Sequence, residues 1–174
     1  MIKVFLAPIG NISSFTIESI TKGLMKKLSA DVEVIDLQID LESVKSIERS
    51  QYYSTKILAS AITLTEHYNG KIMILVDVDL YVPVFTFLFG EAQLNGKHAI
   101  VSLFRLHEEF YSGEINNDLF YSRVLKEVFH ELGHNYGLIH CKDWNCVMHS
   151  STGIEEVDIK GDFYCSSCSK SIIK

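Results

Sequence analysis

The sequence predicts an α/β fold in which helices cover a mostly parallel, twisted sheet that carries an antiparallel strand at one edge. In the first half of the chain, short apolar runs alternate with segments of helical periodicity, an order typical of parallel sheets with crossover helices. Further on, Asn95-Gly96 separates two strand-like runs, as in a β-hairpin. Of the 174 residues, 47% are hydrophobic and only two are proline, so the chain can bury a core without disulfide support.

The first half of the chain is expected to contain three strands and two helices. Strands are indicated by short β-branched or continuously apolar runs, and helices by apolar residues that recur every three or four positions. In chain order these elements are a strand at residues 2–6, a helix that starts at Ser13 or Ser14, a strand at 32–35, a helix over 54–67 and a strand at 71–76. The last run is apolar almost throughout, which predicts a strand buried on both faces.

The second half begins with the hairpin and ends in a segment of weak periodicity. Its two strands are expected at residues 89–92 and 98–103. A helix follows that Asn117 or Asp118 can cap and that runs to Gly137. Beyond this glycine regular patterning fades.

No repeat or linker divides the sequence, so residues 1–174 are expected to form one domain. Its sheet-and-helix part would span about 1–137 and its C-terminal part about 138–174. The net charge of −6 argues against general nucleic-acid binding, which needs a surplus of basic residues. The opening apolar run is too short for an export signal, and no run approaches the roughly 20 residues of a transmembrane helix. We therefore expect a cytoplasmic protein with no nucleic-acid or membrane partner, and a monomer as the default.

Histidines on the last predicted helix have the spacing of a metal site. His130-Glu131-x-x-His134 places two imidazoles on one helix face with a carboxylate beside them. Gly137 then breaks the helix, so that His140 can return as a third nitrogen ligand. Three neutral histidines with one open position are typical of catalytic zinc, and Glu131 would be the general base for the activated water. A chance meeting of unrelated histidines is the alternative, which the added Gly137 and His140 disfavour.

Four cysteines follow in two closely spaced pairs, Cys141-x4-Cys146 and Cys165-x2-Cys168. In a reducing compartment such thiols are more often metal ligands than disulfides. Four thiolates would complete a closed, structural zinc site. Two disulfides, four unrelated thiols or a single iron ion remain as alternatives.

Together these motifs resemble those of the archaemetzincins, a branch of the metzincin metallopeptidases. The histidine motif is followed by Cys141-x4-Cys146-x-Met148 and then by Cys165-x2-Cys168. The loop between these two cysteine motifs, residues 149–164, is one residue shorter than in that family's pattern. Upstream stretches are also similar to the family, at residues 77–83, 89–92 and 102–106.

The resemblance implies a metzincin-like twisted mixed sheet with an active-site helix and a C-terminal segment stapled by zinc. It implies two zinc ions per chain, a catalytic ion on the three histidines and a structural ion on the four cysteines. Met148 would form the Met-turn, a methionine packed beneath the catalytic metal. In metzincins an edge strand above the zinc pairs with extended substrate, and the residues that would do so here are Phe89, Gly90, Glu91 and Ala92. An ordinary edge strand shielded by Glu91 is an equal alternative.

Other polar residues near these motifs are expected to have lesser roles. His149 follows Met148 and is a candidate hydrogen-bond donor at the metal site or contact to substrate. Asp77 and Asp79 end a buried strand and are expected to make turn hydrogen bonds rather than bind metal. The remaining histidines are expected on the surface or in loops: His67, His98 and His107.

The sequence thus predicts a zinc-dependent metallopeptidase that hydrolyses peptide bonds in a peptide or protein substrate. One alternative is a catalytically silent zinc-binding module that binds peptides or proteins, and another is an aminopeptidase of narrow specificity. A pure binding module needs no base beside the metal, so the presence of Glu131 favours an enzyme.

Overall fold

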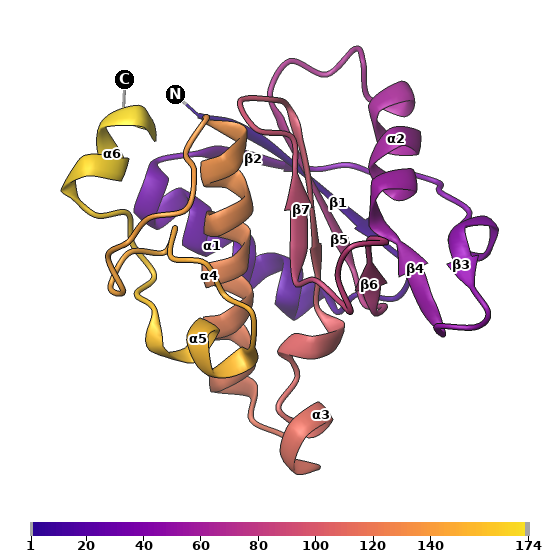
Figure 1. Cartoon of the computed structure of the whole chain (residues 1–174). Helices are drawn as coiled ribbons and strands as arrows, with labels where there is room; N and C mark the ends of the chain where they lie inside the picture. Colours follow the sequence, from indigo (N-terminus) through magenta and orange to yellow (C-terminus); the bar gives the residue numbers. More distant parts are fainter. Residues whose placement is uncertain (1, 173–174) are drawn as a thin grey trace.

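Five strands form the main sheet (Figure 1). The computed structural model describes residues 2–172. In spatial order the strands are β2 (Asp31–Val34), β1 (Lys3–Ile9), β5 (Lys71–Val76), β8 (His98–Ser102) and β7 (Gly90–Ala92). The first four are parallel, and β7 runs antiparallel to β8 at the edge. The prediction of an α/β fold with an antiparallel edge strand is confirmed.

Helices cover both faces of this sheet. One face packs against α1 (Ser14–Leu28) and α4 (Asn117–Asn135), and the other against α2 (Ser54–Leu64). Within residues 2–172, no helix is long and apolar enough to cross a membrane.

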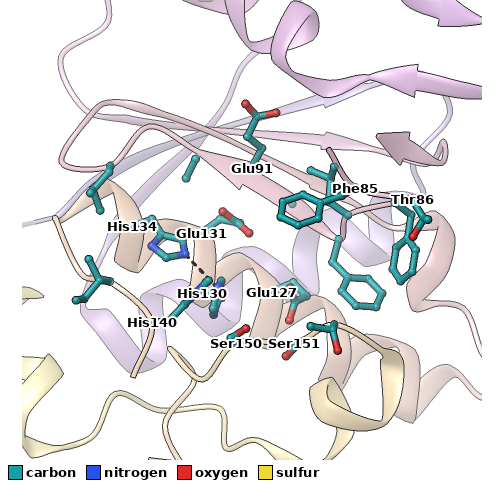
Figure 2. Close-up of a pocket in the computed structure, with 18 residues that line it drawn as sticks. Phe85, Thr86, Glu91, Glu127, His130, Glu131, His134, His140, Ser150 and Ser151 are labelled. Atoms are coloured by element: carbon teal, nitrogen blue, oxygen red, sulfur yellow. Dashed lines mark hydrogen bonds between the residues drawn. The ribbon is translucent and has the colours of Figure 1, made fainter. Parts of the chain in front are cut away.

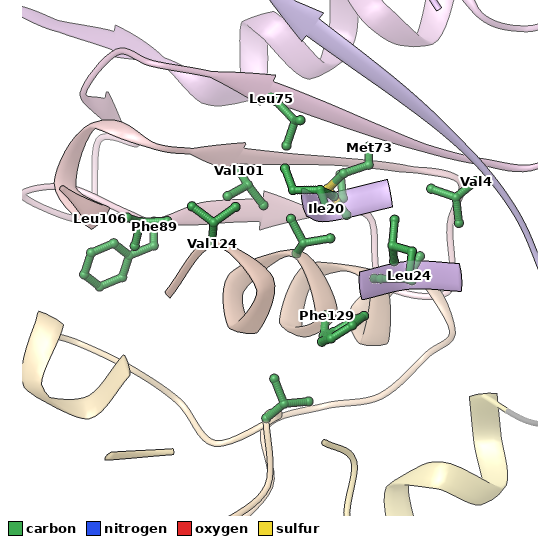
Figure 3. Close-up of a cluster of buried hydrophobic side chains, with 14 of the residues drawn as sticks. Val4, Ile20, Leu24, Met73, Leu75, Phe89, Val101, Leu106, Val124 and Phe129 are labelled. Atoms are coloured by element: carbon green, nitrogen blue, oxygen red, sulfur yellow. The ribbon is translucent and has the colours of Figure 1, made fainter. Parts of the chain in front are cut away.

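Side-chain alternation along β5 divides the core into two apolar clusters. Met73 and Leu75 pack in the cluster that contains α1 and α4 (Figure 3), whereas Ile72 and Ile74 pack in the cluster that contains α2. All four side chains are fully buried. The prediction of a strand buried on both faces, made from the continuous apolar run, is therefore confirmed.

Both long helices begin at side chains that accept hydrogen bonds from the first turn. Ser13 caps α1, as predicted. At α4 the cap is Asn116, one residue before Asn117 and two before Asp118, because its side chain accepts a hydrogen bond from the N–H of Leu119. Asp118 instead lies in the first turn, where its negative charge interacts favourably with the positive end of the helix dipole.

Short elements that periodicity does not reveal fill the connections. Three of them form a second small sheet, in the order β3-β4-β6. The elements are η1 (Glu42–Val44), β3 (Lys45–Ser46), β4 (Gln51–Tyr53), β6 (Leu80–Tyr81), η2 (Phe104–Leu106), α3 (Glu109–Ser112), α5 (Ile154–Ile159) and α6 (Ser166–Ile172). Strands of two or three residues offer too few positions for alternation to be recognised.

The C-terminal segment wraps α4 (Figure 1). Val147 N–H donates a hydrogen bond of 2.8 Å to the carbonyl of Phe163. Tyr164 donates its hydroxyl proton to the carbonyl of Phe129, on α4, over 2.5 Å. Val147 is fully buried in the same apolar cluster as α4. The region of weak periodicity is therefore packed into the core that supports this helix.

One histidine departs from its predicted exposed position. His98 lies on β8 and is only 4% exposed. Its ring nitrogens lie 2.7 Å from Thr65 Oγ1 and 3.0 Å from Gln93 Oε1, so the buried ring is satisfied on both sides. Burial lowers the pKa of His98 to about 4. The prediction of a surface or loop residue was wrong because tertiary partners, invisible in the sequence, satisfy the polar ring inside the protein.

Candidate functional site

The three histidines of the long motif converge on one point. His130 and His134 lie one turn apart on α4, with their Nε2 atoms 3.1 Å apart. His140 follows the helix, and one ligand atom from each of the three rings lies within 4.8 Å of the others. Figure 2 shows these rings grouped at one side of a cleft. Three imidazole nitrogens so close together fit the donor set of a zinc ion with a further position open to solvent.

Backbone carbonyls hold two of these rings in the orientation that a metal requires. His130 Nδ1 lies 2.8 Å from the carbonyl oxygen of Val147, and His134 Nδ1 lies 2.7 Å from that of Leu138. A proton on each Nδ1 leaves the lone pair of Nε2 free. Burial is the main cause that lowers the pKa of His130, His134 and His140. The rings are therefore kept neutral, the form that binds metal.

Two glycines shape the backbone at this site. Gly137 has φ +85° and ends α4, which turns the chain back toward the histidines. Gly133 lies between the two helical histidines, and a Cβ there would collide with Met148 Sδ. Met148 is fully buried. The methionine therefore packs directly against the backbone of the metal-ligand helix, where the resemblance placed a Met-turn.

Glu131 points into the same cleft from a buried position. Its side chain is 5% exposed, and a Cβ on Gly90 of β7 would lie 2.6 Å from Glu131 Oε1. Burial, with a smaller contribution from the negative charge of Glu127, holds the pKa of Glu131 well above its ordinary value. The carboxyl group thus lies between edge strand and helix in an environment that favours its protonated form.

A buried ion pair lies behind the histidines. Lys160 is only 1% exposed, and its Nζ lies 2.7 Å from Glu127 Oε1 and 3.5 Å from His130 Nδ1. Glu127 precedes His130 by three residues and Glu131 by four, so it lies on the same face of α4. The sequence reasoning missed both residues of the pair. The helical spacing of Glu127 from the histidine motif was the signal that could have revealed one of them.

A cleft of about 610 Å³ joins these groups (Figure 2). One side of the cleft is formed by β7 and the residues that precede it, and the other side by the face of α4 that carries the histidines. Segment 150–152, after Met148, closes it from below. The predicted substrate-strand residues all line the cleft: Phe89, Gly90, Glu91 and Ala92. Glu91 turns its carboxylate toward the start of α2, where it accepts a hydrogen bond of 2.9 Å from Thr55 and another from Ser54.

Two predicted polar residues have other partners. His149 is not among the residues that line the cleft. Its ring packs at a tilt against Trp144, with the ring centroids 3.9 Å apart, and its Nδ1 lies 3.0 Å from the carbonyl oxygen of Cys141. Asp79 accepts two hydrogen bonds of 2.7 Å from Arg105. The prediction of turn hydrogen bonds was wrong for Asp79, because its side chain pairs with Arg105, which is distant in the sequence.

The four cysteines form a second cluster. Their sulfur atoms all lie within 4.8 Å of one another, and all four thiols are free. Cys141 Sγ and Cys165 Sγ are 3.9 Å apart, far beyond a disulfide bond of about 2.05 Å but close to the roughly 3.8 Å between thiolates around tetrahedral zinc. Backbone N–H groups at the start of α6 lower the pKa of Cys165 to about 7. The donor set fits a closed structural zinc site.

The two clusters share one loop. His140 and Cys141 are consecutive residues, yet each belongs to a different cluster. Cys141 N–H donates to the carbonyl of Met148 over 2.9 Å, and His149 N–H donates to that of Cys146 over the same distance. The loop that carries the third histidine is thus bonded to the Met148 turn.

Comparison with known proteins gives consistent results. The profile of "Peptidase family M54" matches residues 15–174. The chain is 37% identical to the archaemetzincin of Methanocaldococcus jannaschii, across 99% of this chain and 93% of that protein. It is 36% identical to that of Sulfolobus acidocaldarius, across 99% and 97%.

Solved structures show the same likeness. The archaemetzincin of Archaeoglobus fulgidus, complexed with malonate, has a TM-score of 0.82 at 32% identity, over 98% of this chain and 99% of that one. A zinc-dependent peptidase from Methanocorpusculum labreanum has a TM-score of 0.87 at 26% identity, over 97% and 99%.

Proposed function

Because the chain belongs to peptidase family M54, the archaemetzincins, and is a zinc metallopeptidase, we propose that Glu131 is its general base beside a catalytic zinc ion. The proposed zinc ligands are His130, His134 and His140. The observation that carries the proposal is the convergence of three neutral imidazoles and one buried carboxyl group in a single cleft.

When bound, zinc supplies a Lewis acid that polarises the scissile carbonyl and lowers the pKa of water toward about 7. Glu131 takes the proton from the water oxygen as that oxygen attacks the carbonyl carbon. It then gives this proton to the amide nitrogen as the C–N bond breaks. A raised pKa makes the ionised Glu131 carboxylate a stronger base, and the positive charge of a bound zinc ion would favour that ionised form before the proton transfer.

We propose that the substrate lies extended along β7. This strand is the edge of the main sheet and pairs with β8 on one side only. Phe89, Gly90, Glu91 and Ala92 line the cleft, and their free backbone groups can pair with a peptide. The Glu91 carboxylate is held by Ser54 and Thr55, so it leaves the strand edge open. His149 is not part of this proposal, because it packs on Trp144 outside the cleft.

We propose that the four cysteines hold a second, structural zinc ion, for a total of two per chain. The compact sulfur cluster and its absence of disulfides among the described residues support this. Residues 138–172 pack around α4, which supports the view that residues 1–174 work as one domain. Metal analysis should give about two zinc ions per chain, and a value near one would contradict the two-site proposal.

The decisive experiment compares hydrolysis of a peptide library by the wild type and by Glu131→Gln. Loss of the base should lower kcat by about 10²- to 10⁴-fold while zinc content is unchanged. Cleavage that survives in the variant would remove Glu131 as the base, and absence of cleavage by the zinc-loaded wild type would favour the silent binding module. Peptides with acetylated amino termini separate the remaining alternative, because an aminopeptidase would not cleave them.

A further inference from the structure

The cleft has an aromatic wall and a polar floor. The wall includes Phe85, Phe87 and Phe89, and the rings of the last two meet edge to face at 5.2 Å. Glu127 and Ser151 lie on the opposite side of the cleft (Figure 2). A peptide side chain that fills this space therefore meets apolar surface along its length and polar atoms at its end.

Two polar atoms of the floor lack hydrogen-bond partners among the described residues. Glu127 is 3% exposed, and its Oε1 is buried without a hydrogen bond. Lys160 Nζ lies 2.7 Å from this oxygen, but its direction of approach does not make a hydrogen bond. Ser151 Oγ is likewise buried and unpartnered. Buried polar atoms are almost always satisfied in native proteins, so a ligand that supplies hydrogen-bond donors accounts for Ser151 Oγ and adds a partner to the Glu127 carboxylate beside its ion pair with Lys160.

The charge of this floor selects the kind of donor. A carboxylate offers acceptors only, and its two oxygens have about four lone-pair directions. Lys160 is almost completely buried and is not among the cleft-lining residues, whereas Glu127 lines the cleft, so a second cation can reach the Glu127 carboxylate from the cleft. Aromatic faces also attract ammonium and guanidinium groups. The cleft volume of about 610 Å³ has room for a long side chain.

From these contacts we propose that the cleft selects peptides with a lysine or arginine side chain beside the scissile bond, whose head group binds Glu127 and Ser151. This inference rests on the proposed function of the cleft. The stem of the side chain packs on the aromatic wall while the cation reaches the floor. The free amino terminus of a peptide carries the same charge, but it has no apolar stem to occupy the wall.

The test uses matched peptide pairs that differ in one charge, with lysine against norleucine and arginine against citrulline next to the cleavage site. For the wild type, kcat/KM for the charged member should exceed that of the neutral one by about 10- to 100-fold, the range for a charge-assisted hydrogen bond. Equal rates, or a preference for norleucine, would overturn the proposal.

Two variants locate the source of the preference. Glu127→Asp keeps a negative charge near Lys160 but withdraws it by one methylene group, and Ser151→Ala leaves the ion pair untouched. Both should reduce the ratio between charged and neutral peptides, Glu127→Asp by about 10-fold. Because Glu127 also contacts Lys160 and lies near Glu131, each variant is judged by this ratio and not by its absolute rate. Ser112→Ala, at an exposed residue that does not line the cleft, is the matched control. An unchanged ratio in both cleft variants would refute the assignment.

Binding separates this inference from the proposed function. The same peptides are titrated into zinc-loaded Glu131→Gln and followed by fluorescence anisotropy. Preferential binding of lysine peptides without hydrolysis by the wild type would support the pocket and reject the peptidase mechanism. Hydrolysis without charge preference would support the peptidase mechanism and reject the charge-selective pocket. If acetylation of the amino terminus abolishes the preference, the pocket binds that terminus and the side-chain assignment fails.

Discussion

Replacement of Gly90 by alanine should disable the site through a single methyl group. The Cβ would lie 2.6 Å from Glu131 Oε1, 2.7 Å from its Cγ and 2.8 Å from its Cδ. Ordinary contact begins near 3.4 Å, so the carboxyl group must retreat by somewhat less than an ångström. The carboxyl group is packed in a buried position, and its displacement would take the proposed base away from the substrate. A misplacement of about 1 Å costs on the order of 10²-fold in rate.

Gly90→Ala should therefore lower kcat/KM on a quenched-fluorescence peptide by about 100-fold, with zinc content unchanged. Gly90 is on a strand and its φ lies outside the left-handed region, so alanine fits the backbone itself and global unfolding should change little. The control is the same substitution in a Glu131→Ala background. There the side chain that the new methyl group would displace is absent, so Gly90→Ala should cause no further loss of activity. Activity of Gly90→Ala within about threefold of the wild type, at full zinc content, would refute the reasoning, as would an equal loss in both backgrounds.

Three further outcomes are expected. Lys160→Met should lower the free energy of unfolding by about 3–5 kcal/mol, because it leaves the Glu127 charge buried and unpaired. In urea titrations, adding Glu127→Leu to the same chain should restore most of the lost stability. A Lys160→Met variant as stable as the wild type would contradict this prediction. Because the pKa of His98 is about 4 in the folded chain against an ordinary 6.5, the unfolded chain binds a proton between these values that the folded chain does not. Stability at saturating zinc should then fall as pH drops through this window, by at most about 1.4 kcal/mol per pH unit, and His98→Gln should flatten the fall; equal slopes for the two proteins would rule it out. Cys168→Ser should reduce zinc to about one ion per chain and speed limited proteolysis of residues 138–172, whereas retention of two ions would disprove the role of this thiol.

The sequence revealed elements whose signal is local. The run at residues 71–76 showed β5 because every position of a doubly covered strand is apolar, and Ser13 showed the start of α1 because capping is a contact within one turn. The proposed metal ligands were recognisable for the same reason, since the i, i+4 histidines share a helix face. The clustering of His130, His134 and His140 in space agrees with that expectation.

Features that depend on distant partners were not predictable. Burial of His98 depends on hydrogen bonds with Thr65 and Gln93. The sequence around His98 does not show that these residues will contact its ring. Glu127 looks like any charged helix residue until the chain beyond residue 150 brings Lys160 beneath it. The polar floor of the cleft therefore depends on tertiary structure, whereas the proposed catalytic residues lie together in one sequence motif.

The direct succession of His140 and Cys141 has a thermodynamic consequence. Under the two-zinc proposal, whichever ion arrives first orders the loop that both residues share, so the second ion meets ligands that have already lost their conformational freedom. The first ion thus raises the affinity for the second, and linkage makes this effect equal in both directions. When zinc is scarce, the protein population should divide into chains with two ions and chains with none, so that metal supply sets the number of active molecules rather than the activity of each.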